Sequence, residues 1–190
     1  MARTPSTMVA LGTAAPAFAL PDVRTGNTVR LDDFRGQAAL LVMFLCRHCP
    51  FVVHVQAEVA RVARDFASPK LAVVAISAND VASHPDDAPE RLAAQAREQG
   101  FVFPYLFDES QAVARAYDAA CTPDFFLFRR ESTGLHLFYR GQLDDSRPGN
   151  GKPVTGLDLR RALEAVLSGL PAPEPQIPSI GCNIKWRNAG

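Results

Sequence analysis

An apolar run at residues 38–45 ends directly at a pair of cysteines, and a helical pattern begins directly after them. A continuous apolar run of this length is typical of a strand that is buried on both faces. The pair is Cys46 and Cys49, and it is followed by Pro50, a residue tolerated in a first helical turn. Apolar residues then recur at alternating steps of three and four, at Val52, Val55, Val59, Val62 and Phe66. The sequence therefore predicts a buried strand, a C-x-x-C turn and a helix in direct succession.

The rest of the chain continues this alternation of strands and helices. A second buried strand at 71–77 implies that the helix crosses over between two parallel strands. Asp87 and Glu90 have the spacing of a capping box and predict the start of the next helix. The remaining expected elements are a helix at 88–99, a strand at 101–107, a helix at 111–117, an aromatic strand at 124–128 paired with 135–139, and a helix from Thr155 to Gly169.

Composition favours one domain without a nucleic-acid or membrane partner. The 190 residues include 20 basic and 20 acidic side chains, so the formal net charge is zero and no broad basic face is expected. No apolar run is long enough to span a membrane. The N-terminal stretch is interrupted by Gly12 and Pro16 and makes a poor secretory signal, so we expect a cytoplasmic protein. We expect a single domain at 1–170 and an extended Pro-rich tail at 171–190 that packs on or near it.

The cysteine pair predicts reversible disulfide chemistry. Four cysteines in a chain of this size do not make a disulfide scaffold, and a C-x-x-C beside a βαβ pattern indicates catalytic thiols. A thiolate in the first helical turn is stabilised by the helix macrodipole, which lowers its pKa. The apolar stripe of the helix passes through Cys49 when it is extended backward. We therefore expect Cys49 to face the core as the resolving thiol and Cys46 to lie nearer the solvent as the nucleophile.

The order of strands and helices, with C-x-x-C before the first crossover helix and Thr122-Pro123 before a later strand, resembles the thioredoxin fold. Segments 12–21 and 26–36 resemble the redoxin branch, which holds alkyl hydroperoxide reductase and thiol-specific antioxidant proteins. Four motifs are similar to a bacterial group described as probable thiol-disulfide isomerases or thioredoxin-like proteins: Cys46–Phe51, Cys121–Phe126, Arg140–Asn150 and Pro178–Trp186. The resemblance implies an α/β thioredoxin fold whose central mixed β-sheet is flanked by helices. It also implies a redoxin-type N-terminal β-hairpin extension and an inserted strand–helix unit.

The resemblance further implies roles for residues around the cysteines. Pro123 is expected to be cis and to lie beside the C-x-x-C, which would leave the backbone of Thr122 open to an extended substrate chain. Arg47 and His48 replace the Gly-Pro dipeptide of thioredoxin, and two potential cations beside a thiolate would stabilise the reduced form. Leu40 stands where thioredoxins have a buried Asp, so proton transfer from the second cysteine must use another group or water.

The two remaining cysteines each have two interpretations. Cys121 is either a small apolar residue or an accessory thiol close to the C-x-x-C. Cys182 lies in the Pro-rich tail, where it is either an exposed bystander or a further resolving thiol if the tail folds back.

We expect a thiol-disulfide oxidoreductase that acts on disulfide-containing proteins or small thiols and exchanges electrons with a separate donor. The cysteines themselves are the redox group, and no motif implies a flavin, a nicotinamide or a metal. The alternative is a thiol peroxidase that reduces hydroperoxides through a cysteine sulfenic acid. A second alternative, from a different class, is a non-catalytic copper or zinc carrier that uses thiolates with His48.

Overall fold

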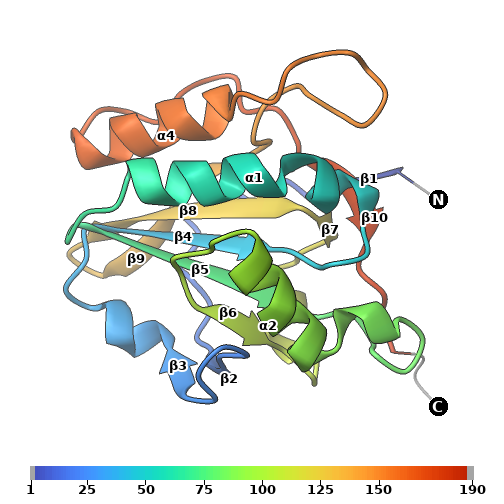
Figure 1. Cartoon of the computed structure of the whole chain (residues 1–190). Coiled ribbons are helices and arrows are strands. Elements are labelled where there is room, and N and C mark those ends of the chain that lie inside the picture. The colour runs from blue at the N-terminus through green and yellow to red at the C-terminus, as the bar shows by residue number, and fades with distance from the viewer. Residues whose placement is uncertain (1–2, 188–190) are drawn as a thin grey trace.

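The computed structural model describes residues 3–187, and its centre is a five-stranded mixed β-sheet (Figure 1). The strand order is β6–β5–β4–β8–β9; β4, β5 and β6 are parallel, while β8 is antiparallel to both β4 and β9. The strands are Ala39–Phe44 (β4), Leu71–Ser77 (β5), Tyr105–Phe107 (β6), Asp124–Glu131 (β8) and Gly134–Arg140 (β9). The expected α/β architecture around a mixed sheet is therefore confirmed.

β4 lies in the middle of this sheet, and every one of its residues is buried. Alternate side chains of a strand point to opposite faces. Leu41 and Met43 accordingly belong to the hydrophobic cluster on one face, and Leu40 and Phe44 belong to the cluster on the other. The apolar run is continuous because both faces of the strand are covered.

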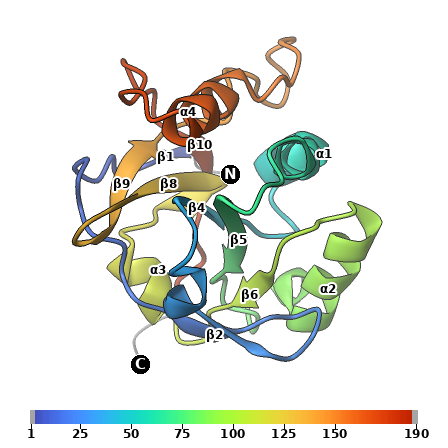
Figure 2. The same cartoon turned by 90° about the vertical axis from the view of Figure 1, so that its left-hand side faces the viewer.

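Helices α1 (Pro50–Asp65) and α4 (Leu157–Leu167) lie side by side over one face of the sheet (Figures 1 and 2). α1 buries the predicted apolar stripe, including Val52, Val55 and Val59. α3 (Ala112–Ala116) lies on the opposite side of the sheet, and α2 (Pro89–Glu98) lies next to β6 (Figure 2). None of the helices within residues 3–187 has both the length and the apolar character needed to cross a bilayer.

The N-terminal β-hairpin is also present, as β2 (Ala19–Pro21) paired antiparallel with β3 (Thr28–Arg30). Two short 3-10 helices, Leu31–Phe34 and Pro85–Asp87, complete the local structure. The strand expected at 101–107 is shorter in the structure, because only β6 at its end pairs with β5. Residues 101 and 103 instead bury two stacked phenylalanine rings whose centroids lie 4.8 Å apart.

The C-terminal tail contains a strand that the sequence analysis did not predict. β10 (Ile180–Asn183) pairs antiparallel with β1 (Arg3–Pro5) on one side and with β7 (Cys121–Thr122) on the other. We call these three strands the cysteine sheet. In Figure 1, β10 lies beside the start of α1. The tail therefore packs against the domain, and part of it pairs as a strand instead of only running over the surface. The Pro-rich composition ends at Pro178, after which the backbone can pair.

Candidate active site

The C-x-x-C turn connects the end of β4 to the start of α1. Cys46 follows Leu45 at the end of the strand, and Cys49 is the N-cap of the helix, with Pro50 in its first position. The extended backbone of Cys49, with φ −72° and ψ 123°, ends the turn. Since the first backbone N–H groups of a helix lack intrahelical partners, they face the second cysteine of the pair rather than the first.

Both sulfurs of the pair are buried, since Cys46 and Cys49 are each 0% exposed. The Sγ of Cys46 lies 3.1 Å from the hydroxyl oxygen of Thr122, and the Sγ of Cys49 lies 3.2 Å from the carbonyl oxygen of the same residue. The prediction that Cys46 lies nearer the solvent is therefore wrong. It assumed an open helix tip, whereas β7 covers both sulfurs.

The negative charge of the dithiol is favoured on Cys49. Its pKa is lowered to about 5, chiefly because the Cys46 thiol donates a hydrogen bond to it, with further donation from the Cys182 thiol and the Val52 backbone N–H. Burial raises the pKa of Cys46, and hydrogen bonding to Cys49 raises it further. The contact with the Thr122 carbonyl opposes this order, because it is a hydrogen bond only while Cys49 is protonated. We favour charge on Cys49, which alone stands at the helix N-terminus.

The expected lowering of the Cys46 pKa is thus reversed in the structure. The first reason is that Cys46 is buried, and the second is that the helix begins at Pro50 rather than at the first cysteine. The macrodipole acts within the first turn, so its stabilisation goes to Cys49. The assignment of Cys46 as the attacking thiol rested on this effect and on exposure, and neither supports it.

The Thr122–Pro123 peptide bond is cis, as the resemblance implied. The backbone of Thr122 is nevertheless not open to a substrate, because its register partner is Cys182 of β10. Ser179 also donates a hydrogen bond from its hydroxyl to the carbonyl oxygen of Pro123, at 3.0 Å. The expectation of an open edge is therefore wrong in this conformation, while substrate binding by Thr122 and Pro123 stays a prediction.

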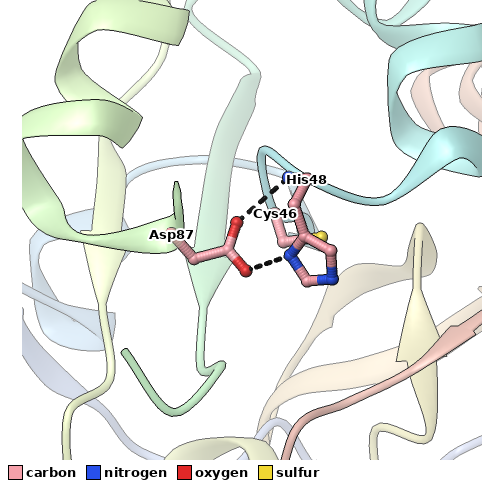
Figure 3. A group of neighbouring side chains, drawn as sticks. All are labelled: Cys46, His48 and Asp87. Carbon is pink, nitrogen blue, oxygen red and sulfur yellow. Dashed lines mark hydrogen bonds and ion pairs between the residues drawn. The ribbon is translucent and has the colours of Figure 1, made fainter. Parts of the chain in front are cut away.

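The two cations of the turn are each directed at a carboxylate. A guanidinium nitrogen of Arg47 lies 3.8 Å from Glu98, and the Nδ1 of His48 lies 2.5 Å from the Oδ2 of Asp87 (Figure 3). The hydrogen bond to Asp87 raises the pKa of His48. Both charges are therefore partly balanced, and the predicted tuning of the redox couple by Arg47 and His48 stays a prediction.

Asp87 is a site residue that the sequence analysis missed. It is fully buried, and it accepts hydrogen bonds from the backbone N–H groups of Arg47 and His48, at 2.7 and 3.2 Å. Its second oxygen accepts a hydrogen bond from the Nδ2 of Asn79 at 2.8 Å and is also hydrogen-bonded to the His48 ring. Burial opposes ionisation, yet the hydrogen bonds from His48 and Asn79 lower the pKa of Asp87. A buried carboxylate thus fixes the shape of the C-x-x-C turn.

The predicted capping role of Asp87 is wrong, because the N-cap of α2 is Ala88 and the Asp87 side chain points to the C-x-x-C turn instead. Nothing in the spacing connects Asp87 with Arg47, since 40 positions separate them. Leu40 stands where thioredoxins have a buried Asp, and here a buried acid comes from a different segment of the chain.

Cys46, His48 and Asp87 also form a possible metal-ligand group, because a ligand atom of each lies within 4.8 Å of the others. Both oxygens of Asp87 already accept two hydrogen bonds each, and the group offers three ligands where a closed zinc site uses four. The residues therefore fit a resident metal poorly, and the carrier alternative stays an untested prediction.

The two further cysteines differ in their surroundings. Cys121 is buried with its Sγ 3.6 Å from the carbonyl oxygen of Pro123, and burial raises its pKa far above the usual range. The Cys182 thiol donates a hydrogen bond to the sulfur of Cys49, and burial raises the pKa of Cys182 to about 12. The four cysteines, all within the described residues, form no disulfide in this structure. Cys182 is thus hydrogen-bonded to the C-x-x-C, whereas the hydrogen bond of Cys121 goes to Pro123.

A polar cleft of about 340 Å³ opens beside the turn. Its lining includes Arg47 and His48 together with Gln56, Gln95 and Glu98. Neither sulfur lines the cleft, so a molecule bound there would contact the dipeptide between the cysteines rather than the thiols.

A family model and a curated relative match this chain. The AhpC/TSA family model matches residues 11–133, more than half of the chain. The chain is 34% identical over 116 residues to a Mycobacterium tuberculosis (strain CDC 1551 / Oshkosh) protein named "Putative peroxiredoxin MT2597", and the match covers 61% of this chain and 68% of that protein.

Solved structures share the fold, one of them over the full length of this chain. An uncharacterised conserved protein from Geobacillus kaustophilus is 54% identical with a TM-score of 0.95, covering 100% of this chain and 99% of that chain. A thiol:disulfide interchange protein of the thioredoxin family from Chlorobium tepidum TLS has a TM-score of 0.61 at 18% identity, covering 83% and 98%, and so shares the fold alone. The fold is thus thioredoxin-like, with buried thiols at its strand–helix junction. The chain belongs to the AhpC/TSA family of redoxins, and its activity is thiol-based redox chemistry.

Proposed function

We propose that the protein is a thiol-disulfide oxidoreductase that cycles Cys46 and Cys49 between a dithiol and a disulfide. The supporting observation is a hydrogen-bonded pair of thiols at the N-terminus of α1, with its charge favoured on Cys49. The Thr122 hydroxyl and carbonyl lie against the two sulfurs, so that one residue touches both reacting groups. The substrates are disulfide-containing proteins or small disulfides, and a separate thiol donor restores the reduced pair.

The reaction follows ordinary thiol–disulfide exchange, with Cys49 as the first nucleophile. The Cys49 thiolate attacks one sulfur of the substrate disulfide; the substrate S–S bond breaks, and the leaving thiolate takes up a proton. Cys46 then gives up its proton and attacks Cys49 in the mixed disulfide, which releases the second substrate thiol. The substrate gains two electrons and the protein is left with a Cys46–Cys49 disulfide. This order is the reverse of the one expected from the sequence.

Trapping of the mixed disulfide tests both the activity and the order. Because Cys182 lies against Cys49, the single variants Cys46→Ser and Cys49→Ser are each made in a Cys182→Ala background. We expect reduction of an aryl disulfide by the background protein, loss of turnover in both variants, and a stable mixed disulfide in Cys46→Ser alone. A mixed disulfide that accumulates only in Cys49→Ser would restore Cys46 as the nucleophile. Turnover that survives both substitutions would exclude the proposed activity.

A thiol peroxidase is the second candidate, favoured by the lowered pKa of Cys49 and by the name of the Mycobacterium tuberculosis relative. In this reaction the Cys49 thiolate attacks a peroxide oxygen, the O–O bond breaks, and a sulfenic acid and an alcohol or water are formed. Cys46 then attacks the sulfenic sulfur, releases water and closes the disulfide. Stopped-flow mixing with hydroperoxide decides this case. Fast consumption that Cys49→Ser abolishes and Cys46→Ser retains for one turnover would make peroxide the principal substrate.

A further inference from the structure

The C-terminal strand lies where an extended chain would meet the cis-proline edge. β10 pairs antiparallel with β7, and Cys182 is the register partner of Thr122. The contact is close, because a Cβ atom on Gly181 would lie 2.0 Å from the Thr122 carbonyl oxygen. Only glycine allows the backbone of β10 to approach this far. The chain has therefore placed its own strand, rather than leaving an open groove, along Thr122 and Pro123.

This pairing places a third thiol at the redox pair. Thr122 contacts the sulfurs of Cys46 and Cys49 through its two oxygens, and Cys182 lies opposite Thr122 in the strand register. The Cys182 thiol is itself hydrogen-bonded to the Cys49 thiol. Cys182 is 1% exposed, so this is a contact inside the protein and not an encounter at its surface. Cys49 thus has two thiol neighbours, Cys46 and Cys182.

We infer that Cys182 is a third redox thiol, and that β10 acts as an internal substrate of the Cys46–Cys49 disulfide. This inference rests on the proposed function. In the step, the Cys182 thiol loses its proton and attacks Cys49; the Cys46–Cys49 bond breaks, a Cys49–Cys182 bond forms, and Cys46 leaves as a thiolate that takes the proton. One disulfide and one thiol are present before and after, so no external oxidant or reductant is needed.

The exchange has a direct structural consequence. An extended substrate can pair with Thr122 only if β10 is displaced, because β10 occupies that edge. A Cys49–Cys182 disulfide would hold β10 in place covalently and leave Cys46 as the one thiol of the pair. Reduction of that bond would remove the covalent link and leave β10 held by strand pairing alone, as it is in this structure with free cysteines. The position of the disulfide would thereby decide whether the edge can open.

Tryptic mapping can separate all four cysteines, because cleavage at arginine and lysine puts each on its own peptide. These peptides are 36–47 with Cys46, 48–61 with Cys49, 116–129 with Cys121 and 162–185 with Cys182. The reduced full-length protein is oxidised with one equivalent of a diazene oxidant, quenched in acid, alkylated and digested without reductant. A cross-link between 36–47 and 48–61 reports the Cys46–Cys49 disulfide, and one between 48–61 and 162–185 reports Cys49–Cys182.

We expect both cross-links in the wild type, loss of the second in Cys182→Ala, and the second alone in Cys46→Ala. Cys121→Ala is the matched control, since this cysteine is also buried in the cysteine sheet but has its Sγ hydrogen-bonded to the Pro123 carbonyl rather than to the pair, and both cross-links should persist in it. Circular dichroism of each variant confirms that it is folded. Absence of the second cross-link from oxidised wild type overturns the inference, whatever Cys46→Ala forms. If the first cross-link and the disulfide-reducing activity are both absent, that result would instead contradict the proposed function.

Discussion

The central sheet and the cysteine sheet are built on opposite principles. β4 and β5 pair over six consecutive register positions, and both faces of the sheet carry large hydrophobic clusters. The cysteine sheet joins strands of three, four and two residues, and its contacts at Thr122 and Pro123 are backbone pairing, one serine hydroxyl and thiols. Extensive burial stabilises the framework, whereas a few local contacts position the thiols. The comparison teaches that the element nearest the chemistry is also the easiest to displace.

The largest expected effect comes from removing a side chain of the central sheet. Phe128 is buried, pairs with Leu40 of β4 and packs edge-on against the Tyr117 ring, at a centroid distance of 5.9 Å. We expect Phe128→Ala to lower the free energy of unfolding by about 3–5 kcal/mol, because it leaves a cavity. Denaturant unfolding measures this change. The rate of thiol alkylation in the folded variant should stay close to that of the wild type, and a large rise would mean that the two sheets do not respond separately.

The next effect concerns the carboxylate that joins the C-x-x-C turn to the framework. Asp87→Asn removes the charge that raises the pKa of His48, and hydrogen bonds to charged groups contribute about 1.5–3 kcal/mol. Because the His48 pKa is raised on folding, its stabilisation is present below the unfolded pKa of about 6.5 and is lost as pH rises through the folded value. The stability loss should therefore be larger near pH 6 than near pH 9.

Urea unfolding of wild type and Asp87→Asn at both pH values measures this difference. The exposed neighbour Asp86 provides the matched control, since Asp86→Asn changes the same charge without a buried partner. An equal loss at both pH values would show that the backbone hydrogen bonds from Arg47 and His48, rather than the His48 ring, account for the role of Asp87.

A smaller loss of stability than in Asp87→Asn is expected when a substitution separates β10 from β7. The same substitution should make the Cys49 thiol more reactive. Gly181→Ala places a Cβ against the Thr122 carbonyl, and overpacking of this kind costs about 1–3 kcal/mol. Since about 1.4 kcal/mol corresponds to tenfold in a population, opening of β10 should speed alkylation of Cys49 by about tenfold or more. Gly36→Ala is the control, because its Cβ would meet nothing within 4 Å. Unchanged alkylation in Gly181→Ala would mean that β10 does not limit access.

The smallest effect is expected at the surface of the same turn. Arg47 and Glu98 form a partly exposed ion pair at 3.8 Å. Pairs of this kind contribute about 0–1 kcal/mol, so Arg47→Ala should change the free energy of unfolding by less than about 1 kcal/mol. Measurement of its redox midpoint against glutathione tests the separate prediction that this cation stabilises the reduced form. A midpoint equal to that of the wild type would remove Arg47 from the residues that tune the couple.

The framework could be predicted from the sequence because its signals are local. The strand at 71–77 has the bounds of β5, and the apolar steps after Pro50 follow the buried face of α1. The aromatic strand, its hairpin partner and the last helix follow from the same kind of periodicity. The resemblance added the cis-proline beside the C-x-x-C and the N-terminal hairpin.

The errors concern contacts between residues that are far apart in the chain. Cys46 was expected near solvent, but its cover comes from Thr122, 76 positions away. The role of Asp87 and the position of Cys182 likewise depend on tertiary pairing that no local pattern records. The proposed reversal of the two thiols has a different origin, since α1 begins at Pro50 and places Cys49, not Cys46, at its N-cap.

The closeness of Cys49 and Cys182 also matters for the entropy of the unfolded chain. A disulfide between Cys46 and Cys49 closes a loop of a few residues, whereas one between Cys49 and Cys182 encloses most of the 190-residue chain. In the chain-entropy description, the short loop stabilises the folded state by about 2 kcal/mol and the long loop by about 5 kcal/mol. Moving one bond by a single exchange would therefore make the protein markedly harder to melt, and heat resistance would report which pair of sulfurs is joined.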